Sequence, residues 1–365
     1  MRLAKLAVGA CSLLLAACIG PVQSRDLRSA LDAQLAENSE QHGIPAQAVL
    51  VLHNGQVVYR NQTGLADVET SRAARPDDIY AAYSVAKLFV STLILELADQ
   101  HRLELDQPAS RYVAGLPPAW RDIRIDQLLS HASGLPDFFD GADGPFPPTR
   151  DDVFLTLGDR PLVFAPGSEQ RYTQTNYLVL QAVLEALHGA PYREIVRTRI
   201  TEPLGMENTS LGLSHAPRDR LVSPYRGDNG RIVRDRMIAW QDYSIAHAEL
   251  FTTPEDLGTF LTAVARGRYA RPETLTRAWQ PSRLLNGELT SFASGWDYAE
   301  ADGFREVGHD GGVKVRVRLL FRGDDLSDHH VIVYLTNGTR DGVWTRRLVE
   351  SVQRIVLRSA VADVD

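Results

Sequence analysis

Residues 84–97 have the sequence SVAKLFVSTLILEL, and apolar side chains surround most of the helix that this stretch predicts. A helix of this kind is buried, so we expect it in the core of the fold. Ser84 and Lys87 stand at its N-terminus, and their i, i+3 spacing puts both side chains on one face, with Cβ atoms about 5–6 Å apart. A desolvated lysine loses affinity for its proton and can act as a base toward a serine hydroxyl. The stretch therefore predicts a central helix and a nucleophile.

A Ser-x-x-Lys pair also has a plain structural explanation, in which Ser84 caps the helix and Lys87 extends to the surface. Lysine usage argues against it, because the chain contains only Lys5, Lys87 and Lys314 and otherwise uses arginine. A generic surface cation at this position would be arginine. Only an amine can release its proton near neutral pH, and the choice of lysine therefore favours a base.

The N-terminal part of the chain predicts two antiparallel strands before this helix. Residues 48–52 and 57–59 are apolar, and they flank Asn54-Gly55, the typical dipeptide of a tight hairpin turn.

The C-terminal part predicts a second pair of strands. Residues 313–321 alternate apolar with basic side chains, a turn region follows at 323–325, and residues 331–335 form an apolar run. A helix over about 343–357 closes the chain, and His329 and His330 are adjacent in the last strand, which points their side chains to opposite faces. We find no metal-ligand spacing.

These patterns predict an α/β fold in which one antiparallel sheet is built from both chain ends and flanked by helices. The sheet-forming parts cover about 27–105 and 290–358. A mostly helical region, interrupted by loops rich in proline and glycine, is inserted at about 106–289.

Ser84-Val85-Ala86-Lys87 resembles the Ser-x-x-Lys motif of the serine β-lactamase and penicillin-binding-protein superfamily. Five further segments match its class C-like branch in the same order, namely 128–135 (LLSHASGL), 164–167 (FAPG) leading to Tyr172, 203–206 (PLGM), 252–257 (TTPEDL) and 308–312 (GHDGG). The resemblance covers about residues 27–358. It implies a β-lactamase-like catalytic domain and a serine hydrolase that acts through an acyl-enzyme on a small ester, a D-amino-acid peptide or a β-lactam.

The resemblance also implies roles for individual residues. Ser84 is the nucleophile, and Lys87 and Tyr172 share the task of removing its proton, with the formal base unassigned. The backbone N–H groups of Ser84 and Gly312 form the oxyanion hole, with Gly312 on an edge strand. The other residues expected to bind substrate are Gln174, His309, Asp310 and Gly311. No metal or organic cofactor is implied, and we expect His131 to support the loops of the fold.

Two departures from the family pattern bear on substrate choice. Gln174 stands where the family has asparagine, and Asp310 adds an acid near the cleft, which Lys314 and the arginines at 316 and 318 can offset. Both changes disfavour anionic, peptide-like substrates, and we expect faster turnover of short esters than of cephalosporins. The alternative is a penicillin- or muropeptide-binding sensor that acylates without turnover, which the lengthened Gln174 favours.

The first residues predict an export signal. A basic start is followed by an apolar run at 6–15 that is too short to span a bilayer, and residues 15–18 (LAAC) resemble the lipobox of bacterial lipoproteins. We therefore expect a signal peptide at 1–17, a lipidated Cys18, a linker at 18–26 and an outer-membrane protein facing the periplasm. Ordinary cleavage after a small-x-small site is the alternative.

The charge of the chain limits its partners. The net charge is −7, and loss of a leader that carries Arg2 and Lys5 would take it to −9. Such a balance disfavours nucleic acid and anionic membrane surfaces as ligands, so the lipid anchor is the expected link to the membrane.

Overall fold

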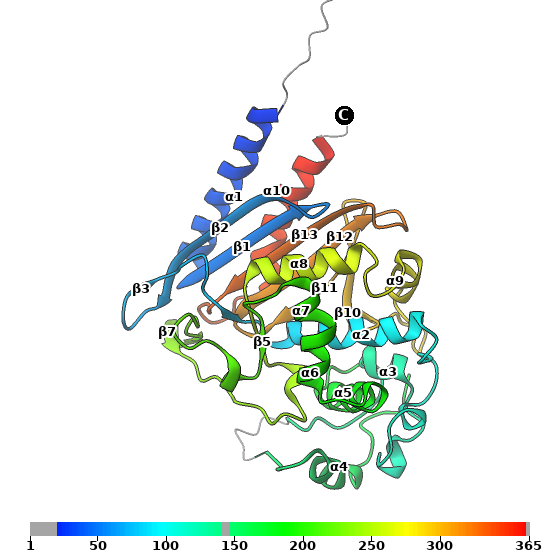
Figure 1. Cartoon of the computed structure of the whole chain (residues 1–365). Coiled ribbons are helices and arrows are strands. Elements are labelled where there is room, and N and C mark those ends of the chain that lie inside the picture. Colours follow the sequence, from blue (N-terminus) through cyan, green and yellow to red (C-terminus); the bar gives the residue numbers. More distant parts are fainter. Residues whose placement is uncertain (1–19, 140–145, 363–365) are drawn as a thin grey trace, which may run out of the picture.

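The computed structural model describes residues 20–139 and 146–362, and it contains an eight-stranded antiparallel sheet in the order β3-β2-β1-β13-β12-β11-β10-β9 (Figure 1). The chain ends meet in the middle of this sheet, where β1 pairs with β13. The predicted sheet from both termini is therefore confirmed. The strands are β1 (Ala46–His53), β2 (Gln56–Asp67), β3 (Arg72–Ala73), β9 (Phe292–Ala293), β10 (Trp296–Ala301), β11 (Phe304–Gly311), β12 (Val315–Arg322) and β13 (Asp328–Thr336).

The N-terminal hairpin forms where the sequence predicts it. Asn54 and Gly55 both have positive φ, 51° and 81°, as the tight turn between β1 and β2 requires. In β1 all residues but His53 are buried, because helices cover both faces of the sheet at this position.

Helices α1 (Gly20–His42) and α10 (Thr345–Ala362) lie side by side on one face of the sheet (Figure 1). Leu31 and Leu35 of α1 share a core with Val352 of α10 and with Val51 and Ile332 of the sheet. The structure corrects the expected linker at 18–26, because α1 already begins at Gly20. Cys18 and the signal peptide lie outside the described residues.

The opposite face of the sheet carries α2 (Lys87–Asp99), α8 (Pro254–Ala265) and the inserted region, which is mostly helical as predicted. Its other helices are α3 (Ile125–Leu129), α4 (Arg150–Gly158), α5 (Thr175–His188), α6 (Tyr192–Val196), α7 (Glu202–Leu204) and α9 (Pro272–Ala278). The sequence did not predict two small sheets there, made of β4 (Tyr80–Ala81), β8 (Leu250–Thr252) and β5 (Ser210–Leu211), and of β6 (Tyr225–Asp228) and β7 (Arg231–Arg234).

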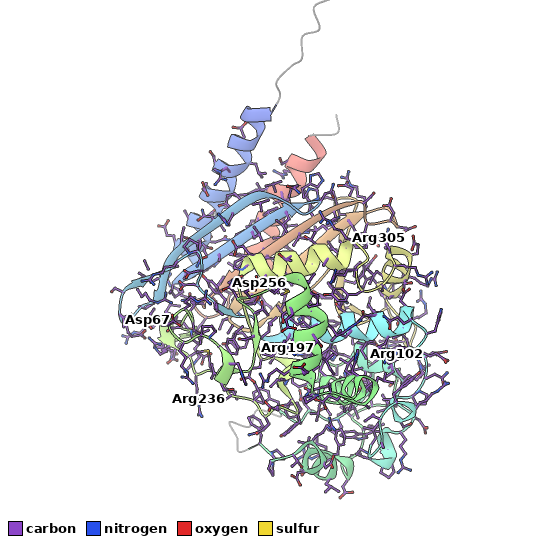
Figure 2. The ribbon with its side chains drawn as sticks, viewed as in Figure 1. Asp67, Arg102, Arg197, Arg236, Asp256 and Arg305 are labelled. Carbon is purple, nitrogen blue, oxygen red and sulfur yellow. The ribbon has the colours of Figure 1, made fainter. Side chains whose placement is uncertain are left out.

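Charged side chains at the periphery form ion pairs, of which Asp67 with Arg234 (2.6 Å) and Arg305 with Asp324 (2.7 Å) lie at opposite sides of the molecule (Figure 2). Exposed pairs of this kind contribute about 0–1 kcal/mol each, so the stability of the fold comes mainly from its apolar core. Among the described helices, none is both long and apolar enough to cross a membrane.

Candidate active site

Ser84 lies at the junction between the sheet and the helical region. The predicted continuous helix at 84–97 is wrong in one respect: Tyr83–Ala86 form a 3-10 turn, and α2 begins at Lys87. Tyr83, the first residue of this turn, has a φ of 48°, which lies outside the α-helical region, so the α-helix does not extend back to this residue. Ala86 is the N-cap residue of α2, so the capping explanation of Ser84 does not apply.

Lys87 is fully buried, which excludes the alternative of a surface cation. Its Nζ lies 3.3 Å from Oγ of Ser84 and 2.8 Å from Oε1 of Gln174, and it also donates to the carbonyl oxygen of His247. Burial lowers the pKa of Lys87 well below its usual value, and the carboxylate of Asp137 opposes this shift only in part. The neutral amine is therefore favoured.

Tyr172 lies in the loop before α5, and its side chain reaches Ser84 and Lys87. The centroid of its ring lies 5.1 Å from Nζ of Lys87, and its hydroxyl forms a hydrogen bond with the side chain of Ser84. Burial raises the pKa of Tyr172 well above its usual value, so the phenol keeps its proton. The ring of His131 packs against it at 4.3 Å, and Nδ1 of His131 accepts from the backbone N–H of Thr173 (3.2 Å), which confirms the supporting role predicted for this histidine.

Gly311 and Gly312 bring the end of β11 against the turn that carries Ser84. A Cβ atom at Gly311 would lie 2.3 Å from the carbonyl oxygen of Ala82, so only glycine allows this approach. The expectation that Gly312 lies on an edge strand needs correction. Gly312 begins a 3-10 turn that follows β11, and β11 is an interior strand of the sheet. The pairing of β11 with β10 ends at Gly308 and Asp297, so the last residues of β11 extend beyond β10.

His309 and Asp310 point to opposite faces of β11. His309 lies near Tyr172 (6.1 Å between ring centroids), and burial lowers the pKa of His309 to about 3, so its ring is neutral. The carboxylate of Asp310 instead binds Arg316 (2.7 and 2.9 Å) and Arg318 (2.8 Å). These arginines hold the carboxylate of Asp310 and compensate its charge, and the expectation that Asp310 binds substrate stays a prediction.

A cavity of about 650 Å³ opens onto the catalytic group and is lined by Ser84, Gln174 and Gly312. Its far wall is apolar, and Trp240 packs there against Phe146 (4.5 Å between centroids) and Phe139 (5.0 Å). The sequence did not indicate this wall, nor did it indicate Asp137 and His247 beside Lys87. No motif marks the wall, since its aromatic residues lie in loops that are far apart in the sequence. Asp137 could have been found from its position, because it directly follows the SGLP segment at 133–136, which is part of a family motif.

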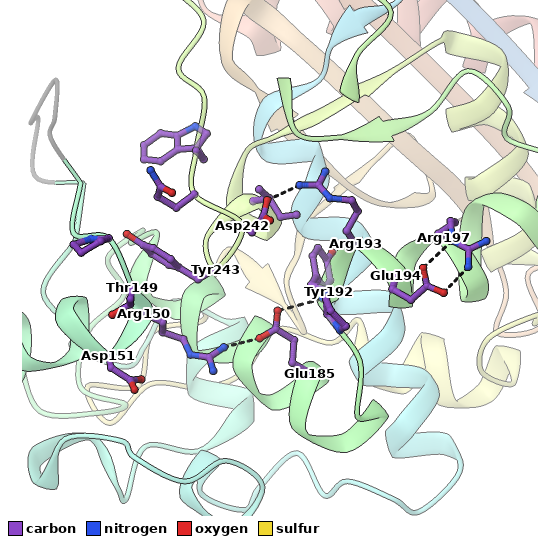
Figure 3. A pocket seen from close by; sticks show the side chains of 15 residues that line it. Thr149, Arg150, Asp151, Glu185, Tyr192, Arg193, Glu194, Arg197, Asp242 and Tyr243 are labelled. Atoms are coloured by element: carbon purple, nitrogen blue, oxygen red, sulfur yellow. Dashed lines mark hydrogen bonds and ion pairs between the residues drawn. The ribbon is translucent and has the colours of Figure 1, made fainter. Parts of the chain in front are cut away.

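A second cavity of about 840 Å³ is larger and shares Trp240 and Gln241 with the first. Its charged side chains pair with one another, Arg150 with Glu185 and Arg193 with Asp242, each at 2.6 Å (Figure 3). Because these charges are already compensated and the nucleophile is elsewhere, the cavity at Ser84 is the candidate active site.

A serine, a desolvated lysine and a tyrosine that meet between an antiparallel sheet and a helical region define a class, the hydrolases with the β-lactamase fold. The chain belongs to the Beta-lactamase family, whose model matches residues 31–350. This match confirms the predicted family, and it covers most of the predicted catalytic domain.

Three curated relatives are 23% to 29% identical to the chain over the matched segments. Penicillin-binding protein 4* of Bacillus subtilis is 23% identical over 84% of this chain and 71% of its own length. Esterase EstB of Burkholderia gladioli is 29% identical over 59% of each protein. The D-alanyl-D-alanine-carboxypeptidase/endopeptidase AmpH of Escherichia coli K12 is 29% identical over 51% of this chain and 50% of its own length. For the last two, the match therefore spans about half to three-fifths of the relative.

Solved structures confirm the fold. EstCE1, described as a hydrolase with promiscuous acyltransferase activity, superposes with a TM-score of 0.77 at 21% identity, over 92% of this chain and 100% of its own. The D-amino acid amidase of Ochrobactrum anthropi gives 0.76 at 20% identity, over 92% and 99%.

Proposed function

We propose that the protein is a serine hydrolase that forms an acyl-enzyme at Ser84, with Lys87 as the base. The observation that carries the proposal is the position of Lys87, whose Nζ is fully buried and lies 3.3 Å from Oγ of Ser84. A general base must lie within reach of the proton that it removes and must be able to accept it, and Lys87 meets both conditions.

The hydrogen bonds of Lys87 support the neutral form. A neutral amine has two N–H donors and one lone pair. The carbonyl oxygens of Gln174 and His247 accept the two N–H groups, which leaves the lone pair for the hydroxyl of Ser84. Tyr172 keeps its proton and is therefore a donor at the start of the reaction.

The proposed reaction follows from these positions. Oγ of Ser84 attacks the carbonyl carbon, its proton moves to Nζ of Lys87, and the oxyanion is stabilised by the backbone N–H groups of Ser84 and Gly312. As the bond to the leaving group breaks, the proton passes to that group through the hydroxyl of Tyr172. Water then attacks the acyl carbon and gives a proton to Lys87, and Lys87 returns this proton to Oγ of Ser84 as the bond to Ser84 breaks and the acid is released.

The cavity favours an ester with an apolar acyl group. Its aromatic wall offers apolar contact area, and the relatives EstB and EstCE1, named as an esterase and a hydrolase, support such a substrate. Gln174 already accepts a hydrogen bond from Lys87, so its carbonyl is not free to hold the amide of a peptide or a β-lactam. We expect faster turnover of p-nitrophenyl butyrate than of nitrocefin or a D-Ala-D-Ala peptide.

Intact-protein mass spectrometry tests the nucleophile. A fluorophosphonate probe should add one label to the wild type and none to Ser84→Ala, while Ser91→Ala, in the adjoining helix α2, serves as the control and is labelled normally. Labelling of Ser84→Ala at the wild-type rate would contradict the proposal.

The hydrogen bond that Gln174 accepts from Lys87 also favours a second candidate function, a penicillin- or muropeptide-binding protein that is acylated once. A burst of product equal to the enzyme concentration, without further turnover on any of the three substrates, would favour this candidate over the hydrolase. Gln174→Asn should raise the relative kcat/KM for the β-lactam or peptide.

We further propose that the protein is exported and lipid-anchored at Cys18, facing the periplasm. Cys18→Ser should lose incorporation of radioactive palmitate, whereas Cys11→Ser, which changes only the leader, should keep it. Equal incorporation into the wild type and Cys18→Ser would contradict the anchor.

A further inference from the structure

A cluster of three metal-ligand side chains lies on the sheet face covered by α1 and α10, opposite the face that carries Ser84. His53 ends β1, and His330 of β13 is its direct partner in the antiparallel register. Asp328 stands two residues before His330 in the same strand, so all three side chains project from the same face.

The donor atoms of the cluster are already close together. Nε2 of His53 lies 3.0 Å from Oδ1 of Asp328, and the rings of His53 and His330 stack at 4.3 Å with an interplanar angle of 7°. One ligand atom from each of the three residues lies within 4.8 Å of the others.

His330 has a polar atom without a protein partner. Its ring is 5% exposed, and its Nδ1 is buried without a hydrogen bond among the described residues. An unpaired buried nitrogen of this kind costs free energy that a ligand could recover. The ring is held against the edge of Phe304, at 5.9 Å and 83°.

The other two ligands are free to adjust. The side chains of His53 and Asp328 are 45% and 48% exposed. Neighbouring ligand atoms in a tetrahedral zinc site are about 3.4 Å apart, given Zn–N distances of about 2.0–2.1 Å. Because the lone pair of an imidazole lies in the plane of its ring, the exposed His53 must turn out of its stack on His330 to close the set around an ion. The exposed side would leave a fourth position to water.

The backbone around the cluster is fixed. Asn54 donates its backbone N–H to the carbonyl of His329 (2.9 Å), and its side-chain oxygen accepts from the N–H of His329 (2.9 Å). Arg322, the register partner of Asp328 in β12, lies over the ring of Phe304 at 4.0 Å, and the carboxylate of Asp328 binds His53 instead.

We propose that His53, Asp328 and His330 form a binding site for a divalent transition-metal ion, with Zn²⁺ as the ion that two imidazoles and one carboxylate fit best. The ion ties the turn between β1 and β2 to the start of β13. It stabilises the centre of the sheet and takes no part in hydrolysis at Ser84.

The test uses the full chain, freed of metal with a chelator and carrying no histidine tag. Equilibrium dialysis at a free Zn²⁺ concentration of about 10 µM, which fills a site of micromolar Kd, should leave one bound zinc ion per chain in the wild type. His53→Ala and Asp328→Asn should lose it. Both residues are exposed, so these variants keep the fold, and His215→Ala, at another exposed histidine, should bind as the wild type does.

Thermal unfolding gives an independent readout. Zn²⁺ should raise the Tm of the wild type and of His215→Ala but not that of His53→Ala, since only an ion bound to the native state stabilises it. Absence of bound zinc in the wild type, or a zinc content in His53→Ala and Asp328→Asn equal to that of the wild type, would overturn the proposal. Hydrolysis of p-nitrophenyl butyrate should be the same with and without the ion.

Discussion

At the scale of single residues, burial decides which of the two coupled groups is the base. Desolvation lowers the pKa of Lys87 and raises that of Tyr172, since it disfavours the charged form of each. Both groups are thereby kept neutral, one with a lone pair and the other with a proton. These two shifts support Lys87 as the proposed base, the choice that the sequence left open.

The first prediction concerns Lys87→Arg. Arginine keeps a positive charge but cannot release its proton near neutral pH, so this variant should be as inactive as Lys87→Ala, with a loss of about 10²–10⁴-fold in kcat. Steady-state kinetics with p-nitrophenyl butyrate measure the loss, and far-UV circular dichroism checks the fold. Retention of most activity by the arginine variant would make Lys87 an electrostatic or structural residue.

The second prediction concerns Glu249, a buried acid of the cavity wall that accepts from the N–H of Leu213 at 2.6 Å. Burial raises the pKa of Glu249 from 4.5 to about 7. The folded state therefore holds this proton more tightly than the unfolded state, and stability falls as the pH rises from 4.5 to about 7.

Glu249→Gln should remove this loss, because its amide oxygen can still accept from Leu213 and carries no charge. The gain in the free energy of unfolding should be small near pH 4.5 and reach about 3–4 kcal/mol above pH 8, from about 1.4 kcal/mol per pKa unit. Urea unfolding at the two pH values measures it, and an equal effect at both would contradict the assignment.

At the scale of elements, the site depends on how closely the end of β11 approaches the 3-10 turn at Tyr83–Ala86. Strand and turn come from distant parts of the chain, and their contact sets the distance between the N–H groups of Ser84 and Gly312. Gly311 permits the contact, since its missing Cβ leaves room for the carbonyl of Ala82.

The third prediction is that Gly311→Ala lowers kcat by about 10²–10³-fold, the usual effect of losing one oxyanion-hole donor, because the new Cβ pushes Gly312 away from Ser84. Gly303→Ala is the control: it lies in the turn before β11 at φ 77°, with open space around the Cβ position. It should lower Tm and leave kcat unchanged. Equal kinetic effects in both variants would show that the loss comes from stability alone.

At the scale of the whole molecule, a buried ion network connects the sheet to α10. Arg318 is fully buried and binds Glu306, Asp297 (2.6 Å) and Asp310 (2.8 Å), while Gln353 of α10 donates to Glu306 at 2.8 Å. The network also holds the strand that carries His309, so it links the α10 face of the sheet to the active-site face.

The fourth prediction is that Arg318→Leu lowers the free energy of unfolding by about 3–5 kcal/mol, because Asp297 loses its ion-pair partner and Arg316 is left to compensate Glu306 and Asp310. Arg322→Leu, at the outer end of the same strand, is the control and should cost much less. Urea unfolding measures both. A small effect of Arg318→Leu would mean that Arg316 alone compensates the three acids.

The sequence by itself determined the sheet from both termini and the family, and it pointed to the proposed nucleophile, because these depend on local order: the Asn54-Gly55 turn, the alternation in the last strands and the motifs that contain Ser84, Lys87 and Tyr172. Only the tertiary structure decided which groups share a space. The strand register puts Asp310 opposite Arg316 and His53 opposite His330. Loops that are far apart in the chain form the aromatic wall around Trp240. The physical reason is that periodicity constrains the face on which a side chain lies, whereas its partners and its desolvation arise only when distant segments pack.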